Sequence, residues 1–234
     1  MGFGFSGEPI FVSPMAIKSS KKELIKKVAS MLPPNISELR FPLIESGDTA
    51  FYLQQIFNTE QFWINEIDHI KYDFWTSLQE HTIEFSREIF QIVEILKSEK
   101  EKNRIKKLMS KSLQESDSPF FRGIAYFYLN GIRINDVLGL DTIHKLLITG
   151  QMLSASKITN CSSYLKIIEK SIYKNIFLYI NAFDFNVDYD RINNIVNKLD
   201  SKIIIVYNKE SNVKNLSSNF NIQKFNEYFI ANNY

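Results

Sequence analysis

The stretch KNIFLYINAFDFN, Lys174 to Asn186, runs an apolar strand directly into a polar and aromatic tip. Its segment NIFLYI consists of apolar, β-branched and aromatic residues, which favour a strand. Loops that follow such strands often carry the side chains that bind ligands. The stretch therefore predicts one strand of the fold and raises the question of whether the tip after it carries chemistry.

Strand-like and helix-like segments alternate on both sides of this stretch. The segment KKELIKKVASML, for example, places Leu24, Ile25 and Val28 on one helical face and ends before two prolines. Strands are predicted within residues 36–44, 60–67, 156–161, 175–180 and 202–208, with a last strand pair within 225–234. Helices are predicted within residues 21–32, 48–57, 69–114, 119–130, 162–171 and 188–199. This alternation predicts an α/β protein with a doubly wound, mostly parallel sheet.

A long helical region interrupts the alternation. It begins at His69 and includes the highly charged segment KSEKEKNRIKKLMSK, which can be buried on no more than one stripe. We expect residues 69–138 to form a helical insertion, a candidate lobe for contact with DNA or a partner protein. Residues 1–68 and 139–234 are then expected to form the α/β domain.

Composition limits the class of protein and its compartment. The chain has 234 residues, 44% of them hydrophobic, which is enough for one substantial core. Its 28 basic and 26 acidic side chains leave a net charge of +2, so any surface for nucleic acid must be local. Cys161 is the only cysteine, which favours a reducing compartment, and we expect a cytoplasmic protein. No apolar run approaches the ~20 residues of a membrane span, so no membrane partner is expected. No metal site is expected either, because the histidines lack acidic or cysteine neighbours at ligand spacing.

Seven segments, which together cover most of the chain from Pro14 to Tyr234, carry a resemblance to a known family. The segments are SPMAIKSSKKEL, FPLIESGDTAFYL, INEIDHIKYDFW, AYFYLNGI, NIFLYINAFDF, IIIVYNKES and EYFIANNY. In their order and in their approximate spacing they resemble the motifs of the Dam-type DNA adenine methyltransferases. The resemblance implies a methyltransferase-like Rossmann fold, the cofactor S-adenosylmethionine, and methyl transfer to an adenine flipped out of duplex DNA.

The resemblance also assigns the tip after NIFLYI a role. The family's catalytic Asp-Pro-Pro-Tyr motif falls on Asn181, Ala182, Phe183 and Asp184. In that motif, the acid and a carbonyl fixed by proline accept hydrogen bonds from the target amine, while the aromatic ring stacks on the base. Asn181 can still accept a hydrogen bond, but Ala182 and Phe183 restore two N–H donors and Asp184 places a charge where a ring is needed. We therefore expect a degenerate motif without activity.

Four residues correspond to the family's cofactor site and are expected to be vestigial. Lys21 matches a lysine of the first cofactor loop, and Gly47 matches a glycine of the turn after the first strand. Glu45 replaces a small residue of that turn and would bring both a Cβ atom and a charge to the cofactor's carboxylate. Glu66 matches an acidic residue that holds the ribose, although a solvated carboxylate at a strand end or a charge at a helix start is an equal alternative. No cofactor is therefore expected, or S-adenosylmethionine if the enzyme is active.

Basic residues collect in the helical insertion and form the candidate surface for nucleic acid. Glu99 and Glu101 dilute this cluster, and a charge run is more often a solvated helix than a phosphate track. The cluster consists of Lys97, Lys100, Lys102, Arg104, Lys106, Lys107 and Lys111.

Three hypotheses about function follow. The first is a non-catalytic methyltransferase-like subunit that binds DNA or braces a partner protein, and it accounts for both degenerate motifs. The second is an active, divergent DNA adenine methyltransferase that uses Asn181. The third is a structural or assembly protein on a methyltransferase scaffold, in which abundant Tyr and Phe side chains supply protein contacts.

Overall fold

The computed structural model describes most of the chain. The described residues are 9–15, 19–33, 36–57, 61–96, 99–131, 140–160, 163–171, 176–181, 188–207, 209–213 and 215–234. No helix in these ranges combines the length and the apolar character that crossing a bilayer requires.

The described strands form one seven-stranded, mostly parallel sheet. In sheet order the strands are β3 (Ser156–Thr159), β2 (Gln61–Asn65), β1 (Glu38–Phe41), β4 (Ile176–Asn181), β5 (Lys202–Tyr207), β7 (Tyr228–Asn232) and β6 (Asn221–Phe225). Only β7 runs antiparallel to its neighbours β5 and β6 in this sheet. The predicted α/β class with a mostly parallel sheet is confirmed, and the order of the first five strands is that of a Rossmann-like fold.

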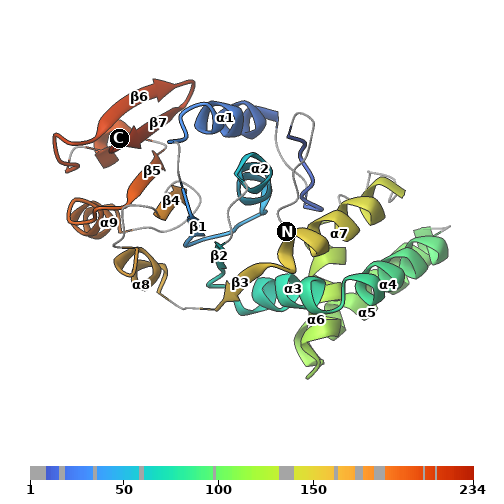
Figure 1. Ribbon diagram of the computed structural model, residues 1–234. Helices are drawn as coiled ribbons and strands as arrows, with labels where there is room; N and C mark the ends of the chain where they lie inside the picture. Colours follow the sequence, from blue (N-terminus) through green and yellow to red (C-terminus); the bar gives the residue numbers. More distant parts are fainter. Residues whose placement is uncertain are drawn as a thin grey trace.

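Strand β4 lies at the centre of the sheet and is buried along its whole length. Phe177 and Tyr179 point into one hydrophobic cluster, and Leu178 and Ile180 point into a second cluster on the opposite face. Helices α1 (Ser19–Ala29) and α2 (Asp48–Ile56) cover the first face, and α8 (Tyr164–Glu169) and α9 (Tyr189–Val196) cover the second (Figure 1). The sheet is therefore doubly wound.

The helical region extends to one side of the sheet in Figure 1. It comprises α3 (His69–Glu80), α4 (Thr82–Ile95), α5 (Glu99–Glu115), α6 (Pro119–Tyr126), a π-helical turn (Phe127–Gly131) and α7 (Leu140–Leu153). Helix α7 was not predicted, and it packs against α3, α4 and β3. Side chains of α3 and α4 share one hydrophobic cluster with those of β1 and β2. The hydrophobic core is continuous across the predicted boundaries at residues 68/69 and 138/139. The division of the chain into two domains there stays a prediction.

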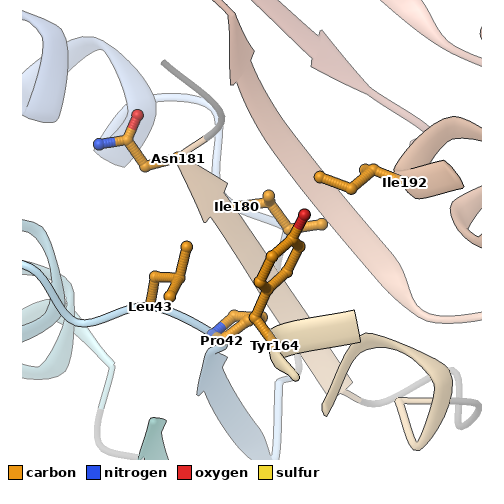
Figure 2. Close-up of a pocket in the computed structure, with 6 residues that line it drawn as sticks. All are labelled: Pro42, Leu43, Tyr164, Ile180, Asn181 and Ile192. Atoms are coloured by element: carbon orange, nitrogen blue, oxygen red, sulfur yellow. The ribbon is translucent and has the colours of Figure 1, made fainter. Parts of the chain in front are cut away.

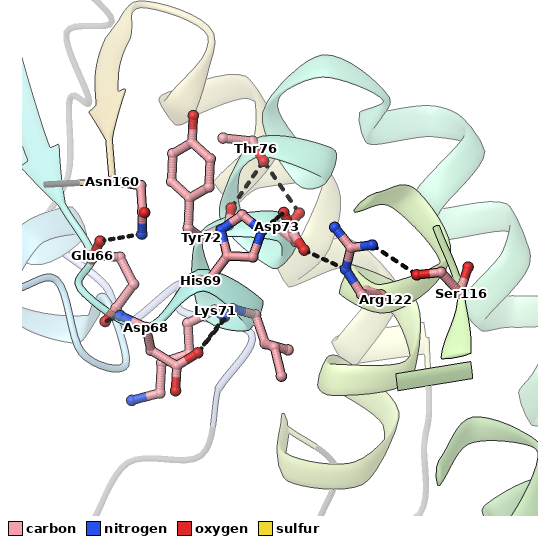
Figure 3. A network of polar contacts seen from close by, with 11 residues as sticks. Glu66, Asp68, His69, Lys71, Tyr72, Asp73, Thr76, Ser116, Arg122 and Asn160 are labelled. Carbon is pink, nitrogen blue, oxygen red and sulfur yellow. Dashed lines mark hydrogen bonds and ion pairs between the residues drawn. The ribbon is translucent and has the colours of Figure 1, made fainter. Parts of the chain in front are cut away.

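A buried ion pair ties α3 to α6 (Figure 3). Arg122 Nε lies 2.7 Å from Asp73 Oδ2, and Arg122 also donates to the Ser116 carbonyl at 2.7 Å. The Asp73 side chain is only 3% exposed, and the exposed His69 side chain, 4.0 Å from Asp73 Oδ1, carries a charge only when it is protonated. Arg122 is therefore the main compensation for a carboxylate that has been removed from water.

Arg122→Met is expected to lower the free energy of unfolding by about 3 kcal/mol, because it leaves Asp73 buried without its counter-charge. The matched control is Arg87→Met at an exposed position of α4, which should change stability by less than about 0.5 kcal/mol. Urea denaturation measures both variants. Adding Asp73→Asn to Arg122→Met should recover a large part of the loss, and equal stability of Arg122→Met and Arg87→Met would contradict this account.

Candidate functional site

The expected ligand position lies at the carboxyl ends of β1 and β4. Strand β1 has β2 as one neighbour and β4 as the other. The connection after β1 leads to β2 on one side, while the connection after β4 leads to β5 on the opposite side. Connections that leave in opposite directions open a crevice at this point, which is where open α/β sheets bind their ligands. We call this position the switch point.

The turn from β1 into α2 forms one wall of the switch point. Glu45 and Gly47 both have positive φ, 56° and 77°. The Gly47 N–H donates to the Ile44 carbonyl at 2.9 Å, and the Gly47 carbonyl accepts the first hydrogen bond of α2, from Phe51. A Cβ atom on Gly47 would overlap the Phe51 ring and lie 2.9 Å from the Trp75 ring. Packing therefore requires glycine at position 47 whether or not a ligand binds.

Glu45 joins the turn to two other elements. Lys21 Nζ, from α1, lies 2.7 Å from Glu45 Oε2. The Asn181 side-chain amide, at the end of β4, donates to the other carboxylate oxygen of Glu45. Lys21 and Glu45 were predicted for the cofactor site and Asn181 for the catalytic site. The structure brings the three together in one chain of contacts across the switch point.

The turn is supported by a second set of polar contacts. The Ser13 hydroxyl donates to the Ser46 carbonyl, and the Ser46 hydroxyl donates to Asp48 Oδ2 at 2.6 Å. Asp48 is 2% exposed at the first position of α2, and its Oδ1 atom meets no hydrogen-bond partner among the described residues. Burial raises the pKa of Asp48 to about 6, although the Ser46 hydrogen bond and the nearby charge of Lys21 act in the opposite direction. Ser13 and Asp48 were missed, because no motif marks Ser13 and an aspartate at a helix start usually serves only as a cap.

Described residues line one depression at the switch point. Figure 2 shows the Tyr164 ring across this depression, beside the end of β4. The depression encloses about 220 Å³, open solvent included. Its lining residues are Pro42, Leu43, Tyr164, Ile180, Asn181 and Ile192.

Glu66 follows β2, where an acidic ribose ligand was predicted, and it is 1% exposed. Its Oε1 atom accepts from the Asp68 N–H at 3.0 Å, and its backbone carbonyl accepts from Asn160 at 2.8 Å (Figure 3). Burial raises the pKa of Glu66, and the charges of Glu66 and Asp68 add to the burial that raises the pKa of Tyr126. The alternative of a solvated carboxylate is wrong, while the roles of a helix-start charge and of a ribose ligand stay predictions.

The side chains of the basic cluster point in different directions around α5. Lys100, Arg104, Lys107 and Lys111 are exposed and follow the spacing i, i+4, i+7, i+11, so they form one stripe along the helix. Lys106 is also exposed, but it points about a third of a turn away from this stripe. Lys102 is half-buried on the opposite side of the helix. Burial raises the pKa of the nearby Tyr128, and the charge of Lys102 acts in the opposite direction. We call the first four residues the α5 stripe.

Some predicted site residues lie outside the described residues. They are Ala182, Phe183, Asp184 and Lys97. Their roles stay predictions.

Comparison with known proteins leaves the family open. No protein-family model matches the chain, and no curated protein matches it. A function must therefore be argued from the geometry of the switch point and of the α5 stripe.

Asp48→Asn should stabilise the protein at pH 7. The folded-state pKa of Asp48, about 6, lies above the ordinary value of 3.8, so the folded protein holds this proton more tightly than the unfolded chain. The stability that the protonated form contributes is complete below about pH 4 and is lost as the pH rises through 6. Over this pH range the free energy of unfolding falls by about 3 kcal/mol.

Urea denaturation of both proteins at pH 4 and pH 7 measures this effect. We expect the gain in Asp48→Asn at pH 7 and little difference at pH 4. Equal destabilisation of Asp48→Asn at both pH values would show that the ionised carboxylate is needed for the turn.

Proposed function

We propose that this protein is a non-catalytic, methyltransferase-like protein that contacts nucleic acid through the α5 stripe. The contact of Glu45 with both Lys21 and Asn181 across the switch point carries the proposal. The order of the sequence segments and the Rossmann-like sheet support the methyltransferase relationship. Neither is evidence of a reaction, because one fold hosts many functions.

The surroundings of Asn181 support the loss of methyl transfer. In the reaction that the resemblance implies, this position accepts a hydrogen bond from the amine that is methylated. Here the Asn181 amide donates to Glu45, which fixes the side chain against the turn, and the residue is 3% exposed. The Asn181 Oδ1 atom, which would have to accept that hydrogen bond, is buried as well, so a target base could reach it only if the surrounding residues moved.

S-adenosylmethionine does not fit the residues at the switch point. The carboxylate of the cofactor would meet the carboxylate of Glu45, and Lys21 already pairs with Glu45 at 2.7 Å. The left-handed turn, which could bring bare backbone close to a ligand, carries a long side chain at position 45 instead. The proposal therefore contains no step through the cofactor.

The α5 stripe supports contact with nucleic acid. Lys100 and Lys111 are eleven residues apart, which places about 16 Å of helix behind the four cations. Duplex DNA carries about one negative charge per 1.7 Å of its axis, so the stripe can face several phosphates at once. Such contacts do not depend on base sequence, and each neutralised phosphate releases counterions. We therefore expect binding that is sequence-independent and weakens steeply with salt.

Calorimetric titration with S-adenosylmethionine tests the closed site. The wild-type protein should show no saturable binding up to about 1 mM cofactor. At this concentration, binding with a free energy of about −4 kcal/mol would be detected. A dissociation constant in the low micromolar range would overturn the proposal. Methyl transfer to adenine that disappears in Asn181→Ala would establish the active alternative.

A gel shift with duplex DNA at about 50 mM salt tests the α5 stripe. Reversing the charge of Lys100, Arg104 and Lys107 to Glu should abolish retention of DNA and leave the melting temperature nearly unchanged, because these side chains are exposed. The control reverses the same number of exposed charges elsewhere, at Lys166, Lys198 and Lys209. This control should retain DNA. If the wild type shifts no DNA, a protein partner replaces nucleic acid in the proposal and is sought by co-purification.

A further inference from the structure

We infer that Lys21 and Asn181 form a carboxylate-binding site and that Glu45 occupies it as an internal ligand. This inference rests on the proposed function, in which the switch point is closed to a cofactor. It adds that the group closing the switch point is a carboxylate. An external ligand for this site would be a small aliphatic carboxylate.

The contacts of Glu45 are those of a bound carboxylate. Each carboxylate oxygen meets a different donor, the ammonium group of Lys21 at 2.7 Å and the amide of Asn181. The side chains of Lys21 and Glu45 are 16% and 11% exposed, so water screens their attraction only in part. Charge-assisted hydrogen bonds of this length are among the stronger polar contacts in proteins.

The two donors are positioned by elements that do not depend on Glu45. Lys21 belongs to α1, which is anchored by the fully buried Leu24 and Ile25. Asn181 is the last residue of β4, which pairs with β5 up to that position. Removal of the Glu45 side chain should therefore leave both donors in place and facing one vacancy. A site that is organised before its ligand arrives binds with less loss of entropy.

The backbone of Glu45 indicates which substitution opens the site without damage to the fold. A residue with a Cβ atom is strained at φ 56°, whereas glycine adopts this conformation freely. Glu45→Gly therefore removes the carboxylate and relieves the turn. Glu45→Ala removes the same carboxylate but keeps the strain, so it should melt below Glu45→Gly.

Propionate, which matches the end of a glutamate side chain, is the probe. Thermal unfolding is followed in sodium propionate, in sodium chloride of the same ionic strength and in neutral propionamide. Glu45→Gly should melt about 3–6 °C higher in propionate than in either control once the ligand is in about tenfold excess over its dissociation constant. The wild type should show no such difference, because Glu45 fills the site. Adding Lys21→Met to Glu45→Gly should remove the response.

The inference is overturned if Glu45→Gly responds equally to propionate and chloride, or if Lys21→Met leaves the response intact. Should Glu45→Gly fail to fold, Glu45→Gln, Lys21→Met and their double variant provide a second test. The double variant should lose no more melting temperature than the worse single variant, and additive losses would contradict direct pairing. Micromolar binding of S-adenosylmethionine to the wild type would overturn the proposed function alone. A missing propionate response with no cofactor binding would overturn only this inference.

Discussion

Strand β4 has no exposed face, and the arrangement of the other elements follows from this constraint. A central strand with apolar side chains on both sides needs a helical layer on each side of the sheet. Helices α1 and α2 on one face and α8 and α9 on the other meet that need. A chain that supplies both layers must reverse its direction of winding once, between β1 and β4. The burial of β4 thus creates the switch point at which functional residues are expected.

At the switch point, backbone geometry and side-chain chemistry have different causes. The left-handed conformation at Gly47 lets β1 turn directly into α2, and the rings of Phe51 and Trp75 leave no space for a Cβ atom there. Gly47 is therefore required by packing alone. Glu45 has no such steric reason, and its strained conformation is maintained by the contacts of its carboxylate with Lys21 and Asn181. The scaffold of a ligand site is thus present while its polar groups bind one another.

The two candidate surfaces differ in how they depend on the fold. The Lys21–Glu45–Asn181 contact joins three elements and is lost if any of them shifts. The α5 stripe needs only one helix, because its four cations are brought together by helical periodicity. A surface of that kind can retain contact with phosphates after an enzyme site has closed. This difference is a physical reason for our proposal, in which the protein contacts nucleic acid without catalysing methyl transfer.

The sequence by itself determined the class of fold and most elements, because periodicity and turn residues act over a few neighbouring positions. The runs NIFLYI and KIIIVYN predicted β4 and β5, and the apolar stripe of KKELIKKVASML predicted α1. Helix α7 was missed because polar or small residues occupy buried positions: Thr149 donates to the Val12 carbonyl, and Gly150 gives room to Thr82. Only the tertiary structure decided the candidate site. Glu45 is 24 residues from Lys21 and 136 residues from Asn181, and the order of strands in the sheet, not local sequence, brings these side chains together.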